Sequence, residues 1–96
     1  MTVYAIAQLK IHDRELYGRY LTRFMDVLKA HKGRLLAADD SPRVLRGDVA
    51  MDKVVLLSFD NEDQFRVWGA SPEYLEISKD RDASSDATIL LVRGIG

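Results

Sequence analysis

Hydrophobic residues along this chain follow two different patterns. Branched and aromatic residues cluster in residues 2–11, 34–38, 53–59 and 86–94, a composition typical of β-strands. Between the first two clusters, apolar residues recur every three or four positions, which is the period of an amphipathic helix. The residues of that helical stripe are Leu16, Tyr17, Tyr20, Leu21, Phe24, Leu28 and His31. We therefore expect a strand, a long helix and a second strand in the first half of the chain.

Capping residues indicate where the first two helices begin and end. Asp13 is a preferred N-cap for the long helix, and Gly33 is expected to end it in the left-handed conformation. Asn61, three residues before Gln64, predicts the start of a second helix through a relative of the capping box. This second helix should lose its register at Gly69.

The stretch "WGASPEYLEISKDR", residues 68–81, combines a hydroxyl, aromatic rings, carboxylates and cations, so it invites a catalytic interpretation. A helix start explains most of it. Ser71 is a preferred N-cap, Pro72 suits the first helical position, and Glu73 lies near the positive end of the helix dipole. The residues expected to face inward from this third helix are Tyr74, Leu75 and Ile77.

The order of these elements predicts an α+β ferredoxin-like domain with an antiparallel sheet, a single domain over residues 1–96. A short extended piece is expected at residues 43–48. Residues 54–57 and 89–92 are continuously apolar, whereas a sheet with one solvated face should alternate apolar and polar residues. Because the helices can cover only one face, we expect a homodimer in which a second subunit covers the other face.

Composition excludes several classes of partner and chemistry. The 14 basic and 15 acidic residues are interspersed, and the net charge is −1, so nucleic acid is not an expected partner. No apolar stretch approaches the ~20 residues that span a bilayer, and no membrane association is expected. The absence of cysteine removes disulfides and thiolate chemistry and fits a cytoplasmic location.

Several segments together resemble the bacterial family known as domain of unknown function 1330: "YAIAQLKIHDRELYGRYL", "AHKGRLL", "VLRGD", "VVLLSF" and "WGASPEYLEISKDRDASS". That family is similar to the dimeric α+β barrel superfamily, in which two ferredoxin-like sheets face one another inside a coat of helices. Relatives in the superfamily include cofactor-free monooxygenases, muconolactone isomerases and haem-dependent enzymes. The resemblance therefore implies an architecture and not a reaction.

Two positions depart from the family pattern. The family usually has glycine where this chain has Lys32, and often has an aromatic residue beside the tryptophan, where this chain has Gly69. The missing ring at Gly69 could enlarge a nearby cavity.

His31 and Arg34 are the candidate catalytic pair. His31 could act as a general acid or base, since histidine titrates near neutrality. Arg34 could hold a substrate carboxylate or enolate through a bidentate contact. The alternative for His31 is structural, because a histidine at a helix C-terminus often hydrogen-bonds the last carbonyls.

Four aromatic residues are candidates for substrate binding: Tyr17, Tyr20, Trp68 and Tyr74. The alternative for the three tyrosines is that they are core residues whose hydroxyl groups reach the surface, and the alternative for Trp68 is that it anchors the packing. No metal site and no cofactor is expected, because His12 and His31 lie at opposite ends of one helix and no glycine-rich phosphate-binding motif occurs. Haem binding by His31 rests on analogy with the superfamily alone.

Two functional hypotheses follow. The first is a cofactor-free enzyme, monooxygenase-like or isomerase-like, acting on a small organic acid or enolisable metabolite in a mostly apolar pocket between the sheet and the long helix. The second is a non-catalytic homodimer that binds a small metabolite or a protein partner. A pH–rate profile with an inflection near the pKa of histidine would favour the enzyme.

Overall fold

The computed structural model describes residues 1–95, which contain one antiparallel sheet and three helices. The strands are β1 (Val3–Ile11), β2 (Arg34–Asp39), β3 (Lys53–Phe59) and β4 (Ser85–Arg93), and the helices are α1 (Arg14–Ala30), α2 (Glu62–Ala70) and α3 (Pro72–Ser84). The strands pair in the order β2-β3-β1-β4, and every pair is antiparallel. The predicted ferredoxin-like order of elements is confirmed.

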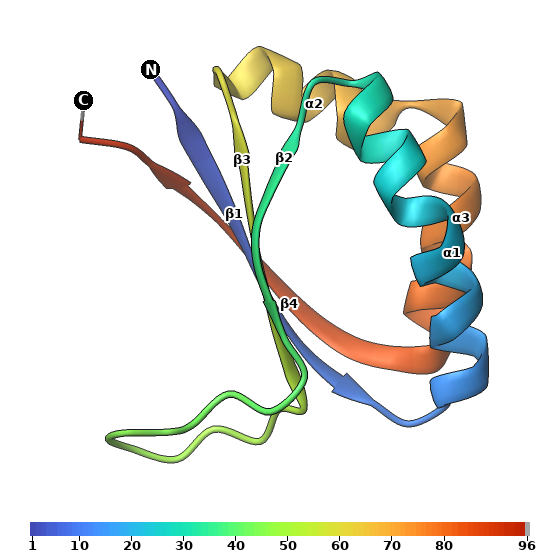
Figure 1. Cartoon of the computed structure of the whole chain (residues 1–96), viewed down its shortest axis with the longest axis vertical. Coiled ribbons are helices and arrows are strands. Elements are labelled where there is room, and N and C mark those ends of the chain that lie inside the picture. Colours follow the sequence, from blue (N-terminus) through green and yellow to red (C-terminus); the bar gives the residue numbers. More distant parts are fainter. Residues whose placement is uncertain (96) are drawn as a thin grey trace.

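The three helices all lie on one face of the sheet (Figure 1). In the register of the central strands, Val3 pairs with Phe59 and Ala5 pairs with Leu57. All four residues are buried, so this inner face forms the hydrophobic core together with the apolar stripe of α1. Burial of this interface provides most of the driving force for folding.

The opposite face of the sheet, called the outer face below, is apolar but uncovered in this chain. Its residues alternate with those of the core and comprise Tyr4, Ile6, Val54, Leu56, Leu90 and Val92. Leu90 and Val92 are exposed by 49% and 41%, and the other four are half-buried. Both faces of the sheet are therefore apolar, as the runs at residues 54–57 and 89–92 predicted.

The three predicted N-caps are confirmed. The side chain of Asp13 accepts a hydrogen bond from the Leu16 N–H at 3.1 Å, and Asn61 accepts one from Gln64 at 2.9 Å. Ser71 caps α3 through the Tyr74 N–H at 3.2 Å. Each of these bonds satisfies a backbone donor that has no partner inside its helix.

The end of α1 differs from the prediction. Lys32, with φ of 63°, adopts the left-handed conformation that was expected of Gly33. Glycine is needed at position 33 for a different reason. A Cβ atom there would lie 2.3 Å from Leu28 Cδ1 and 2.7 Å from Phe59 Cε1, so the chain could not pass this close to the core.

Three further expectations are corrected. Residues 43–48 form no strand but belong to a loop, residues 40–52, which runs away from the helices (Figure 1). Gly69 does not interrupt α2, which continues to Ala70. Leu75 is 52% exposed, because the buried stripe of α3 runs through Tyr74 and Ile77, and the adjacent position turns about 100° away from it.

Candidate functional site

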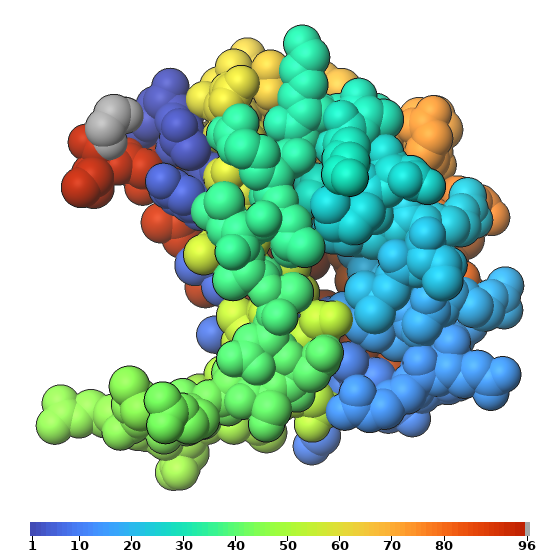
Figure 2. Space-filling view, in the orientation of Figure 1, coloured from blue at the N-terminus to red at the C-terminus, as the bar shows by residue number. Residues whose placement is uncertain are grey.

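A cavity of about 240 Å³ lies between the inner face of the sheet and the helices. It is larger than the ~150 Å³ cavities known to bind benzene. Small residues leave this space open, including Ala5 and Ala7 on β1 and Gly69 on α2. A Cβ atom at Gly69 would meet nothing within 4 Å, which fits the expectation that a missing ring enlarges the cavity there. In Figure 2 a small opening lies between the atoms of α1 and those of the neighbouring strands.

Aromatic side chains line the helical wall of the cavity. Tyr17 and Tyr20 lie on the buried stripe of α1, and their ring centroids are 5.5 Å apart. Trp68 of α2 and Tyr74 of α3 contact each other at 4.0 Å between centroids. The structure thus brings the four predicted substrate-binding residues to one cavity, and their role in binding stays a prediction.

Arg81 of α3 places a cation in this aromatic wall. Its Nη1 donates a hydrogen bond to the Tyr74 hydroxyl, which lies 3.5 Å from the hydroxyl of Tyr20. The guanidinium also lies 5.6 Å from the centre of the Tyr74 ring and 6.0 Å from that of Tyr20. Its side chain is only 13% exposed, and its carboxylate partner Asp82 is mostly exposed. The guanidinium therefore borders the cavity while its counter-ion faces solvent.

Burial and neighbouring charges set the ionisation of these groups. Burial raises the pKa of Tyr17 to about 12, and burial together with Tyr74 raises the pKa of Tyr20 well above its usual range. For Arg81, burial lowers the pKa, but Tyr74 and Asp82 outweigh it and raise the pKa overall. At neutral pH the cavity thus presents neutral phenols of Tyr17 and Tyr20 and a charged guanidinium, a donor set suited to an anionic oxygen.

Lys53 brings a second cation to the cavity from the first position of β3. Its side chain is 7% exposed, and its Nζ lies 5.3 Å from the centre of the Tyr17 ring and 3.3 Å from Asp40. We did not identify Lys53 or Arg81 as cavity residues from the sequence. The available signal was spacing, because Lys53 shares the face of Val55 and Leu57 on β3, and Arg81 follows the stripe of Tyr74 on α3.

One polar group of a cavity-lining residue, unlike Arg81 and Lys53, lacks a partner. The indole Nε1 of Trp68 is buried and makes no hydrogen bond to any of residues 1–95, and the same holds for Oε1 of Gln64. A buried donor without an acceptor is unfavourable by about 1–3 kcal/mol.

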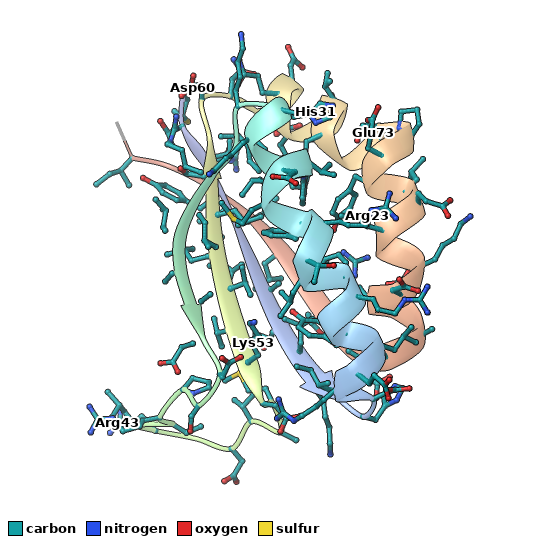
Figure 3. The ribbon with its side chains drawn as sticks, turned by 45° about the vertical axis from the view of Figure 1, so that its right-hand side comes forward. Arg23, His31, Arg43, Lys53, Asp60 and Glu73 are labelled. Carbon is teal, nitrogen blue, oxygen red and sulfur yellow. The ribbon has the colours of Figure 1, made fainter. Side chains whose placement is uncertain are left out.

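His31 and Arg34 do not meet at this cavity. The Nδ1 of His31 lies 2.9 Å from the Val27 carbonyl oxygen, and its Nε2 lies 3.8 Å from Glu73. Figure 3 places His31 near Glu73, far along α1 from the end of the sheet that carries Lys53. The contact with Val27 is the structural alternative considered for a helix-terminal histidine.

Arg34 points to the other side of the sheet. It pairs in register with Ser58, which in turn pairs with Tyr4 of the outer face. Its Nε donates to the Ser58 hydroxyl at 3.0 Å, and its Nη1 lies 2.9 Å from Asp60. The expected convergence of His31 with Arg34 is not observed, and their catalytic role stays a prediction that the cavity does not support.

Two other kinds of site are absent from the described part of the chain. Within residues 1–95, no group of three or more histidine and carboxylate side chains is arranged to hold a metal ion. None of the helices in that range is long and apolar enough to cross a bilayer.

Solved structures share this fold at low sequence identity. A protein of unknown function from Rhodopseudomonas palustris aligns with a TM-score of 0.85 at 17% identity, covering 99% of this chain and 83% of that one. SnoaB, a cofactor-independent oxygenase from Streptomyces nogalater, aligns with a TM-score of 0.72 at 14% identity, covering 99% and 94%. A dimeric ferredoxin-like protein of unknown function from Thermobifida fusca aligns with a TM-score of 0.70 at 16% identity, covering 98% and 92%. The structural similarity establishes a ferredoxin-like fold, whereas sequence identities this low leave the reaction open.

The sequence itself matches one family. None of the curated proteins matches it. Residues 2–95 match the family model described as "Domain of unknown function (DUF1330)". Because this match spans nearly the whole chain, the protein belongs to the DUF1330 family.

Proposed function

We propose that the cavity binds a small, largely apolar molecule through one acidic oxygen, and that the domain acts on this molecule without a cofactor. The acidic oxygen would belong to a carboxylate or to an enol. The observation that carries this proposal is the guanidinium of Arg81, which is nearly buried beside an aromatic cavity and hydrogen-bonded to Tyr74.

The contacts of Arg81 explain why an anion is favoured there. A buried cation is unfavourable unless an anion or hydrogen-bond acceptors satisfy it. Tyr74 offers one acceptor and exposed Asp82 the other, and both approach from α3 itself. A ligand oxygen on the cavity side would gain a charge-assisted hydrogen bond, which contributes about 1.5–3 kcal/mol. The same group would stabilise negative charge that develops on an enolate oxygen during a reaction.

A non-catalytic binding protein is the second candidate, and one observation favours it. Among the described residues that line the cavity, none is a histidine or a carboxylate, so no obvious general base faces the ligand. An enzyme built on this cavity would therefore suit molecules acidic enough to bind as their anions. The structural similarity to SnoaB, a cofactor-independent oxygenase, supports the proposal that this domain is an enzyme.

Calorimetric titration with 3-phenylpropionate tests the binding step. We expect Arg81→Gln to weaken binding about 10- to 100-fold, which is the loss of one charge-assisted hydrogen bond. Arg19→Gln is the matched control, because that arginine lies on α1 with its side chain 72% exposed. Equal affinities of wild type and Arg81→Gln for 3-phenylpropionate would contradict the proposal. Incubating an enolisable 1,3-diketone with the protein, with and without dioxygen, then separates turnover from retention without conversion.

We also propose that the outer face pairs with the same face of a second copy. The motive is its run of apolar residues from all three of β1, β3 and β4, of which Leu90 and Val92 are among the most exposed. Burial of apolar area stabilises such a contact by about 25 cal/mol per Å². Native mass spectrometry should find a dimer that Leu56→Lys disrupts and Val67→Lys, on the exposed side of α2, does not. A monomeric wild type at micromolar concentration would exclude this interface.

A further inference from the structure

Lys53 lies beside Tyr17, an aromatic residue of the same cavity that Arg81 borders. The Nζ of Lys53 lies 5.3 Å from the Tyr17 ring, and both cations belong to the lining of the cavity. After burial, which is the largest influence, Asp40 raises the pKa of Tyr17 and Arg81 lowers it. Lys53 therefore packs on the Tyr17 ring, and the charges of Arg81 and Asp40 both influence the Tyr17 hydroxyl.

Asp40 differs from the other members of this group in its exposure. Its side chain is 74% exposed and stands at the start of the loop at residues 40–52, whereas the side chain of Lys53 is 7% exposed. A buried ammonium needs an anion, but an exposed carboxylate gains little from an ion pair because water solvates it well. Asp40 thus satisfies Lys53 from the solvent side, and the cavity side of the ammonium stays available.

We propose that Lys53 is a second anion-recognition residue, and that the preferred ligand is a small organic acid with two acidic groups. One group is held by Arg81, and the other is held by Lys53 on the side of its ammonium that borders the cavity. This inference rests on the proposed function, because it assigns the second acidic group of the same ligand. The apolar and aromatic walls contact the carbon skeleton between the two groups, and Tyr17 lies beside it.

Two acids with the same skeleton test this assignment by calorimetry: 3-phenylpropionate and 3-(4-carboxyphenyl)propionate. We expect wild type to bind the diacid about tenfold more tightly than the monoacid, as one additional charged contact implies. Lys53→Met should abolish this preference, so that the monoacid and the diacid bind with affinities within about twofold of each other. Asp40→Asn should strengthen binding of the diacid severalfold, because no carboxylate then competes for Lys53. Asp39→Asn is the matched control, since Asp39 pairs with Val54 of the outer face and should change neither affinity.

The outcomes separate the two proposals. Equal affinities for the monoacid and the diacid, with both still weakened by Arg81→Gln, would overturn the role of Lys53 and leave the proposed function standing. Binding of neither acid would overturn both. If Lys53→Met does not fold, Asp40→Asn still tests the role of Lys53, because Asp40 is exposed and its site tolerates the change. An unchanged affinity of Asp40→Asn for the diacid would contradict the inference.

Discussion

The two ends of the domain along α1 carry similar residues in different situations. At the C-terminal end of α1, His31 contacts a carbonyl of its own helix, and Arg34 is satisfied by Ser58 and Asp60. At the other end, Arg81 and Lys53 are nearly buried beside a cavity, and their carboxylate partners stand in solvent. The difference teaches that a titratable residue suggests a binding site when it is buried with space beside it. Arg34, by contrast, is 48% exposed, and neither Arg34 nor His31 is among the residues that line the cavity.

Gly33→Ala should strongly destabilise the end of the domain at the C-terminus of α1. The added Cβ would overlap Leu28 and Phe59, and overpacking of a well-packed core costs typically 1–3 kcal/mol. We expect the free energy of unfolding in urea to fall by that amount. Gly18→Ala is the control, because a Cβ there meets no atom within 4 Å, and it should be neutral or stabilising. Unchanged stability in Gly33→Ala would contradict the close approach at this position.

Alkaline pH should destabilise the end of the domain that carries the cavity. The pKa values of Tyr17 and Tyr20 are raised in the folded state. Their contribution to the free energy of unfolding is therefore fully present below pH 10.0, the ordinary pKa of tyrosine, and is lost as pH rises. Between pH 10 and 12 the unfolded chain loses these two protons and the folded chain keeps them. The free energy of unfolding should therefore fall with a slope of about two protons. Tyr17→Phe should reduce that slope to about one proton, and equal slopes in urea denaturation series would refute the assignment.

Tyr74→Phe, at the cavity, should weaken ligand binding more than a substitution at His31, at the other end of the domain. It removes the hydroxyl that accepts a hydrogen bond from Arg81, so the guanidinium is less well oriented toward the cavity. We expect affinity for 3-phenylpropionate to fall about three- to tenfold, or roughly 1 kcal/mol. His31→Gln should change it by less than twofold, because His31 does not line the cavity. A larger loss in His31→Gln than in Tyr74→Phe would reverse the comparison.

Lys32→Gly should give the smallest effect, a stabilisation of about 0.5–1 kcal/mol. Lys32 has φ of 63°, where a side chain is unfavourable by roughly 1–2 kcal/mol and glycine is not. The greater freedom of glycine in the unfolded chain offsets part of this gain. Thermal unfolding monitored by circular dichroism measures the difference, and a lower melting temperature would show that the Lys32 side chain contributes contacts of its own.

The features that were predicted correctly depend on local chemistry or on chain order. Asp13, Asn61 and Ser71 are N-caps because each side chain reaches a backbone donor within three residues. The apolar run at residues 54–57 indicated a two-sided sheet, since successive residues of a strand point to opposite faces.

The features that were missed depend on contacts across the fold. Gly33 is required by Phe59, which lies on β3 and far away in sequence. Arg34 follows His31 closely in the chain, yet the strand turns its side chain to the outer face. Arg81 and Lys53 come from α3 and β3, and only packing of the two elements brings them to one cavity. The sequence shows spacing along each element but not which elements share a cavity.

The most direct test of anion recognition by Arg81 is the pKa of 4-nitrophenol bound to the protein, read from its visible absorption. Burial in an apolar cavity alone would raise this pKa, because it disfavours the charged phenolate, whereas a neighbouring guanidinium lowers it. We predict that wild type lowers the pKa of the bound phenol below that of the free phenol, and that Arg81→Gln raises it. A bound phenol whose pKa is unchanged or raised in wild type would contradict the proposed function.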